Sequence, residues 1–178
     1  MWASDRLCHV KKIDALPTFE TSVLPAYKRG EQPKCWGDSI ECDEIWAFVG
    51  NKDNPQWVWL SWSYQTTQTL SFSVGPRDTV TGRAMWDGIP EGYRKKQVYT
   101  DGLNIYDSLI PYSQHWVAEK GTGATNVAEG CNNYLRHRVS YLVRKSMSFA
   151  RNIEWLKRRL YFVLFSRNER IKERYQHA

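Results

Sequence analysis

The stretch Ile40-Glu-Cys-Asp-Glu-Ile-Trp-Ala-Phe-Val49 decides the fold of this chain of 178 residues. Its hydrophobic pattern predicts a β-strand, followed by a turn over residues 50–55 and a second strand over 57–64. Residues 70–74 predict a third strand, closed by Gly75-Pro76. Three short strands joined by tight turns predict an antiparallel meander.

Beyond the meander, strand-like and helix-like periods alternate along the chain. The expected elements are a helix over 79–86, a strand over 97–100, a helix over 103–110, a strand over 114–117, a flexible joint at 121–123, a helix from Asn126 and a last helix over 152–175. The order βββαβαβα predicts an α/β fold of the ribonuclease-H-like class, with a mixed five-stranded sheet flanked by helices and a basic C-terminal helix.

The two longest expected helices each have an apolar side. In the first, that side is formed by Leu135, Val139, Leu142 and Val143. In the last helix, it is formed by Ile153, Leu156, Leu160 and Leu164. We expect the last helix to pack through this side against the body of the protein or against another protomer.

Three parts are expected along the chain. Residues 1–37 contain three prolines and no sustained hydrophobic period, which predicts an irregular arm. Residues 38–150 form the ribonuclease-H-like domain, and residues 151–178 form a basic amphipathic helix. No internal repeat is present.

The composition excludes several classes of protein. With 42% hydrophobic residues, 9 Trp, 10 Tyr and 6 Phe, a disordered chain is excluded. No apolar run is long enough to span a membrane, and the first residues lack the layout of a secretory signal. The four cysteines form no CxxC pair, so we expect reduced thiols in a cytoplasmic protein and no structural zinc within this chain.

The positive charge is concentrated at the C-terminal end. Residues 134–178 contain 12 Lys and Arg against 3 Asp and Glu, whereas residues 1–133 lean acidic within an overall charge of +6. This asymmetry favours a polyanionic partner, most simply nucleic acid. Basic amphipathic helices also bind acidic membranes or other proteins, and many are solvated faces without a partner.

Three acidic residues stand out by position. Asp43 shares a strand face with Ile45 and Ala47, and a carboxylate among apolar neighbours is costly unless something such as a bound cation compensates it. Asp101 lies where the fourth strand ends, and Glu129 lies in the first turn of a helix. Acids from two strands and a helix that converge at one end of a sheet are a suitable ligand set for a pair of divalent metals.

Each acid also has an ordinary interpretation. Asp43 fits an exposed strand edge that carries the charged residues 41–44, and Asp101-Gly102 fits a simple turn. Glu129 follows Asn126 by three residues, the spacing of a capping box. Taken singly, Asp101 and Glu129 favour these structural interpretations, whereas the three acids together favour a catalytic one.

The helix that begins at Asn126 adds polar residues near Glu129. Arg136 lies two helical turns after Glu129 and projects from the same side, with Asn132 and Asn133 between them. A cation and two amides at this place suit contacts with a DNA phosphate and with DNA bases. The ordinary alternative is a solvated helix face.

Four motifs in order resemble one known family. They are Cys42-Asp-Glu-Ile-Trp-Ala-Phe-Val-Gly50, Tyr99-Thr-Asp-Gly-Leu-Asn-Ile-Tyr106, Glu129-Gly-Cys-Asn-Asn-Tyr-Leu-Arg136 and Leu142-Val-Arg-Lys-Ser-Met-Ser-Phe149. Their wording and spacing are similar to the InsB-like transposases of bacterial insertion element one, which are members of the DDE transposase and integrase superfamily. The resemblance covers roughly residues 39–165.

The resemblance implies a DNA transposase that cleaves and joins strands at the ends of a mobile element. Its acidic triad would be Asp43, Asp101 and Glu129, which would hold two Mg²⁺ or Mn²⁺ ions for in-line displacement at phosphorus. The residues expected to contact DNA are Arg136, Asn132, Asn133, Arg144, Lys145, Lys157, Arg158 and Arg159. The implied partners are double-stranded DNA and further copies of the chain, in the bacterial cytoplasm at the nucleoid.

The chain departs from the family pattern in two respects. Gly130 and Val127 occupy places where the family often has Arg and His. The zinc-binding and helix-turn-helix region of complete family enzymes is also not found, so an upstream reading frame is expected to supply it. The chief alternative is therefore a catalytically decayed transposase that still binds DNA. Two further alternatives are a nuclease acting on RNA–DNA hybrids and a protein-binding scaffold.

Overall fold

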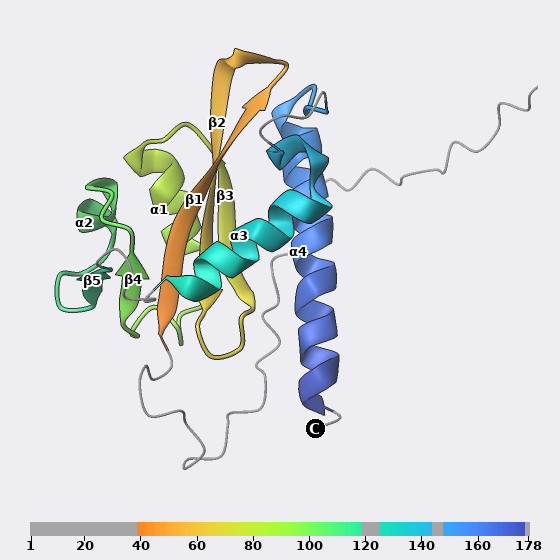
Figure 1. Cartoon of the computed structure of the whole chain (residues 1–178). Helices are drawn as coiled ribbons and strands as arrows, with labels where there is room; N and C mark the ends of the chain where they lie inside the picture. The colour runs from red at the N-terminus through yellow and green to blue at the C-terminus, as the bar shows by residue number, and fades with distance from the viewer. Residues whose placement is uncertain (1–38, 119–124, 144–147, 177–178) are drawn as a thin grey trace, which may run out of the picture.

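The computed structural model describes residues 39–118, 125–143 and 148–176, which form a five-stranded sheet with helices on both faces (Figure 1). The strands are β1 (Ile40–Val49), β2 (Asn51–Ser63), β3 (Thr69–Gly75), β4 (Val98–Thr100) and β5 (His115–Val117). The helices are α1 (Thr79–Asp87), α2 (Ile105–Leu109), α3 (Asn126–Arg138), the 3₁₀ turn η1 (Ser140–Leu142) and α4 (Ile153–Gln176). The predicted element order and the ribonuclease-H-like α/β class are confirmed.

The sheet is mixed, as predicted. Its strand order is β3-β2-β1-β4-β5, with β1, β2 and β3 antiparallel to their neighbours in the meander. β4 runs parallel to β1, and β5 runs parallel to β4. β1 is therefore a central strand, paired on one side along its whole length with β2 and on the other side with β4 only at Ile40 and Glu41.

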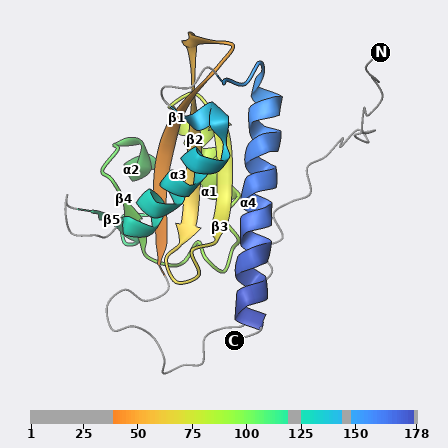
Figure 2. The same cartoon turned by 45° about the vertical axis from the view of Figure 1, so that its right-hand side comes forward.

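Each face of the sheet is covered by its own helices (Figure 2). Alternate residues of β1 project to opposite faces, so Ile45 packs with Leu135 of α3 and Leu160 of α4, whereas Cys42 packs with the cluster that includes Met85 of α1 and Leu109 of α2. The result is a three-layer arrangement in which both faces of β1 are buried.

The last helix packs against the body of the protein. Leu156, Leu160 and Leu164 of α4 are fully buried in the core that also contains Ile45, and the predicted apolar side of this helix is confirmed. Its Asn168 accepts a hydrogen bond from the backbone N–H of Thr69 at 3.0 Å and donates one to the Thr69 carbonyl at 2.8 Å. These bonds satisfy backbone groups at the edge of the sheet, so α4 completes both the core and that edge.

Two local predictions are wrong. The segment expected as a turn over residues 50–55 belongs mostly to β2, and the chain reverses at Gly50, whose φ of +76° suits glycine. The helix expected to include Val139 and Leu142 ends at Arg138, because Val139 adopts an extended backbone before η1. Val139 and Leu142 are nevertheless buried in the same core, whereas Val143, also expected on the apolar side of that helix, follows η1 and is 41% exposed.

Other expectations concern residues outside the described part. The irregular arm at residues 1–37 and the joint at 121–123 lie there. Within the described residues, no helix has the length and apolar character needed to cross a membrane.

Candidate active site

The site lies where β4 ends beside β1. β4 stops at Thr100, and Asp101 follows at once, next to the part of β1 that carries Asp43 and Glu44. Carboxylate oxygens of these three residues lie within 4.8 Å of one another. Carboxylates are the hard oxygen ligands that Mg²⁺ and Mn²⁺ prefer, so the donor set suits such an ion.

The surroundings of Asp43 exclude the exposed-edge interpretation. β1 lies between β2 and β4, Glu41 is fully buried, and Glu44 is 8% exposed. Asp43 itself is half-buried and shares its face with Ile45 and Ala47, as the alternation predicted. The acidic residues therefore stand inside the sheet, where burial makes their charge costly.

Burial determines the electrostatics of Asp43. It raises the pKa of this carboxyl to about 7, helped by the nearby charges of Glu44 and Asp101 and opposed by the Glu44 backbone N–H and by Arg136. The Nδ2 group of Asn132 donates a hydrogen bond to Asp43 Oδ2 at 2.5 Å. A cation beside Asp43 would relieve the repulsion among the carboxylates.

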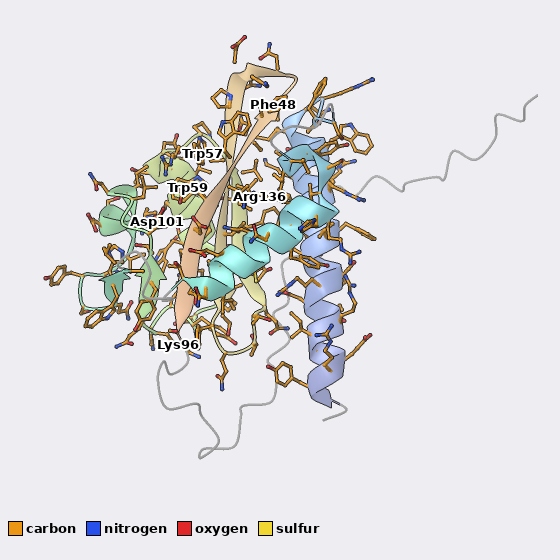
Figure 3. All side chains as sticks on the ribbon, viewed as in Figure 1. Phe48, Trp57, Trp59, Lys96, Asp101 and Arg136 are labelled. Carbon is orange, nitrogen blue, oxygen red and sulfur yellow. The ribbon has the colours of Figure 1, made fainter. Side chains whose placement is uncertain are left out.

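Figure 3 shows that Asp101 and Arg136 come from different elements, beyond β4 and on α3, on either side of β1. Asp101 is exposed, and its Oδ1 accepts a hydrogen bond from the Leu103 N–H at 3.3 Å. Next to it, Thr100 Oγ1 lies 2.8 Å from His115 Nε2 of β5. The turn interpretation of Asp101 is thus correct, and the same turn brings its carboxylate to Asp43.

Glu44 is a member of the cluster that sequence reasoning did not select. Its Oε1 forms an ion pair with Arg77, and its Oε2 accepts a hydrogen bond from the Tyr106 hydroxyl at 3.1 Å. Burial raises its pKa, and the bonds from Arg77 and Tyr106 oppose that shift. The sequence did contain a signal for Glu44, because it is the third acidic residue of a strand that is otherwise rich in apolar residues. The exposed-edge interpretation treated residues 41–44 together as a charged surface and so did not single it out.

Glu129 lies apart from the three-residue cluster. It is exposed in the first turn of α3, one turn before Asn132 on the same side of the helix. The expected capping box with Asn126 is wrong, because α3 begins at Asn126, and its N-cap residue Thr125 makes no side-chain cap bond. The charge of Glu129 instead acts on Glu41.

Glu41 joins β1 to the start of α3. Its Oε2 accepts a hydrogen bond from the Ala128 N–H at 2.7 Å, and its Oε1 is buried without a hydrogen-bond partner among the described residues. Burial raises the pKa of Glu41 to about 7, although hydrogen bonds from the backbone N–H groups of Ala128 and Val127 act to lower it. This side chain therefore fixes the helix that carries Glu129 and Asn132.

The raised pKa of Glu41 predicts a pH-dependent stability. In the unfolded chain this carboxyl releases its proton near pH 4.5, whereas the folded chain keeps it until about pH 7, so the free energy of unfolding falls as pH rises between these values. Glu41→Gln should flatten this decline, by up to about 1.4 kcal/mol per pH unit. Urea unfolding at pH 5, 6, 7 and 8 measures it, with the exposed Glu91→Gln as the control. An unchanged slope in Glu41→Gln would contradict the assignment.

The residues expected to contact DNA have different surroundings. Asn132 is buried against Asp43, whereas Asn133 is exposed and accepts a hydrogen bond from Arg136 at 3.3 Å. Arg144 and Lys145 lie outside the described residues. Lys157, Arg158 and Arg159 leave α4 in three directions, because consecutive helical residues project about 100° apart.

Local contacts hold each of these three α4 side chains. Lys157 pairs with Glu154 at 3.3 Å, and the Arg158 guanidinium lies 6.0 Å from the Trp155 ring centroid. Arg159 donates to the Arg138 carbonyl at 3.3 Å, which places it beside the C-terminal end of α3. Arg159 therefore lies next to the basic last turn of α3.

Comparison with known proteins agrees with this geometry. A family model described as IS1 transposase matches residues 39–165. The insertion element iso-IS1n protein InsB of Shigella dysenteriae is 30% identical over 114 residues, which cover 64% of this chain and 84% of that protein. The insertion element IS1 protein InsB of Shigella sonnei and the IS1 4 protein InsB of Escherichia coli K12 are each 28% identical over 115 residues, which cover 64% of this chain and 84% and 66% of those proteins. The chain therefore belongs to the IS1 transposase family.

Proposed function

We propose that this protein is the catalytic part of a transposase that cleaves DNA at the ends of an insertion element and joins the freed ends to target DNA. The convergence of Asp43 and Asp101 where β4 ends beside β1 is the observation that supports this function most strongly. Ligand sites of α/β sheets lie at the carboxyl ends of parallel strands, where Asp101 stands.

Asp43 and Asp101 would hold the divalent metal. Two Mg²⁺ or Mn²⁺ ions bound there would neutralise charge at the phosphorus and activate water or a 3′ hydroxyl. Asn132 directs one oxygen of Asp43 by its hydrogen bond, and Arg77 and Tyr106 hold Glu44 in place beside both carboxylates. The acids are therefore held in position before DNA arrives, which is what phosphoryl transfer requires of the protein.

Glu129 is the third acid of the proposal. It projects from the same side of α3 as Asn132 and Arg136, and both of those residues act on Asp43. Its exposed carboxylate is one helical turn from the residue that binds Asp43. Glu129 would complete the ligand set from α3.

The DNA would lie over the C-terminal half of α3. Arg136 and Arg138 belong to the basic last turn of this helix, and Arg159 of α4 is bound to the Arg138 carbonyl. Together with the exposed amide of Asn133, these cations give a surface for the phosphate backbone beside the acidic cluster. Asn132, being buried, acts as a positioning residue for Asp43.

The partners follow from the same proposal. They are double-stranded DNA, further copies of this chain assembled on it, and the product of an upstream frame that recognises the element ends. The site of action is the bacterial nucleoid in the cytoplasm.

The proposal is tested by DNA cleavage with the full chain. Supercoiled plasmid, whose cutting does not depend on recognition of element ends, should be cut in Mg²⁺ or Mn²⁺ and not in Ca²⁺ or a chelator. Glu129→Gln should lose cutting while keeping salt-sensitive DNA binding. Asp87→Asn, an exposed acid at the end of α1, is the matched control. Absence of cutting by the unaltered chain in every divalent metal would overturn the proposal.

A decayed DNA-binding protein is the second candidate, and Gly130 is the observation that favours it. The residue after Glu129 is exposed, and a Cβ atom built on it would meet nothing within 4 Å. The structure thus has room for the larger side chain that the resemblance leads one to expect there, so packing does not account for the glycine. DNA binding without cutting would support this candidate.

A further inference from the structure

The outward side of α4 carries an aromatic stripe formed by Trp155, Phe162 and Phe165. These side chains are exposed by 57%, 63% and 42%, whereas Leu156 and Leu160 on the inward side are fully buried. Figures 1 and 2 both show α4 at the margin of the molecule beside β3. Large apolar side chains gathered along one exposed line mark an interaction surface.

The three aromatic side chains share one side of α4, and two of them are held by neighbouring side chains. The members of the stripe are seven and three residues apart, which places them on one side of the helix over about 15 Å. The ring of Phe165 stacks on Tyr161 at 5.9 Å with an interplanar angle of 12°, and Arg158 lies over the ring of Trp155. Side chains held in this way lose little further freedom when a partner binds.

The charges along the outward side reverse their sign at the middle of the stripe. Arg158 precedes Phe162, whereas Glu169 and Glu173 follow it, at spacings of four, seven and four residues that keep all four on one side of α4. Arg151 lies seven residues before Arg158, just ahead of the first turn of the helix. Arg158 and Glu169 stand four residues before and seven residues after Phe162, and Arg151 and Glu173 stand eleven residues before and eleven after it, so both pairs are centred within about two residues of Phe162.

We propose that a second copy of this chain docks on the aromatic stripe, with the two α4 helices antiparallel about a two-fold axis near Phe162. This arrangement places Arg158 of each copy opposite Glu169 of the other copy, and Arg151 opposite Glu173. Glu154 and Lys172 lie on one flank of the stripe, and the same arrangement places Glu154 of each copy opposite Lys172 of the other copy. A parallel arrangement would instead oppose like charges, so the charge order selects both the partner and its direction.

The inference is independent of the proposed function, because it concerns the free protein without DNA. The full chain should sediment as a dimer at micromolar concentration in analytical ultracentrifugation. Phe162→Ser should raise the dissociation constant about tenfold or more, since truncated central aromatic residues carry such losses. Tyr112→Ser, at a residue that is 97% exposed elsewhere on the surface, is the matched control and should leave the dimer intact.

A charge exchange tests the antiparallel pairing itself. Arg158→Glu alone and Glu169→Arg alone should each be monomeric at concentrations where the unaltered chain is dimeric. An equimolar mixture of the two variants should recover a dimer, because each of these contacts in the mixed dimer then joins a carboxylate of one copy to a guanidinium of the other. Circular dichroism and thermal melting confirm that each variant is folded.

Several outcomes would overturn the inference. A chain that stays monomeric at about 100 μM has no such interface. A dimer that survives both Phe162→Ser and Arg158→Glu uses another surface. A monomer whose DNA affinity falls in Phe162→Ser would assign the stripe to nucleic acid instead.

Discussion

Replacing Asp43 by asparagine is expected to lower metal-dependent DNA cleavage by about 100-fold or more while the fold persists. Replacing a residue that only orients a metal ligand typically costs about 10–100-fold in metal affinity or activity, and in the proposed site Asp43 is itself a ligand, from the carboxylate cluster. Because burial already raises the pKa of this carboxyl to about 7, the neutral amide should leave the metal-free protein as stable as before or more stable at pH 8.

This opposition between activity and stability is the diagnostic result. Cleavage rates are measured in Mn²⁺ at pH 8, and urea unfolding is followed in a chelator, with Asp87→Asn compared in both assays. A structural carboxylate would show the reverse pattern, a loss of stability with cleavage retained. Wild-type cleavage by Asp43→Asn would remove Asp43 from the metal site.

Truncating Leu160 to alanine is expected to reduce the free energy of unfolding by about 2–5 kcal/mol. Leu160 is fully buried in the core formed by β1, β2, α3 and α4, so its removal leaves a cavity between the last helix and the sheet. The loss is read from denaturant unfolding at constant pH.

Val80→Ala is the matched control for this change. Val80 lies on α1 with 78% of its surface exposed, and truncating it should change stability by less than about 0.5 kcal/mol. A cost below about 1 kcal/mol for Leu160→Ala would mean that α4 is an appended helix whose packing contributes little to folding.

Much of the fold could be predicted from the periodicity of the hydrophobic residues alone. The apolar side of α4 and the face of Asp43 were both predictable, because a helix and a strand each repeat at a fixed interval. The end of α3 at Arg138 was not, since Val139 and Leu142 continue the apolar pattern while the backbone has already become extended. Periodicity records which side chains are buried, and Val139 is buried without being helical.

The site was predictable in part. Asp43 and Asp101 were selected because one stood among apolar residues and the other at a strand end. Glu44 was not, because its place in the cluster depends on β4 ending at Thr100 and on Arg77 and Tyr106, which are 33 and 62 residues away. Asn132 was expected to contact DNA. Its hydrogen bond to Asp43 depends on α3 crossing over β1, an arrangement that the sequence alone does not reveal.

The shortness of β4 makes the site less durable than the fold around it. β1 and β2 are aligned over ten residue pairs, whereas β4 meets β1 at two. Local opening of that seam costs far less free energy than global unfolding, and it separates Asp101 from Asp43 while the core beneath α3 and α4 remains closed. Amide hydrogens of β4 should therefore exchange well before those of β1 and β2, and catalytic competence should fade on heating or in denaturant ahead of any loss of secondary structure.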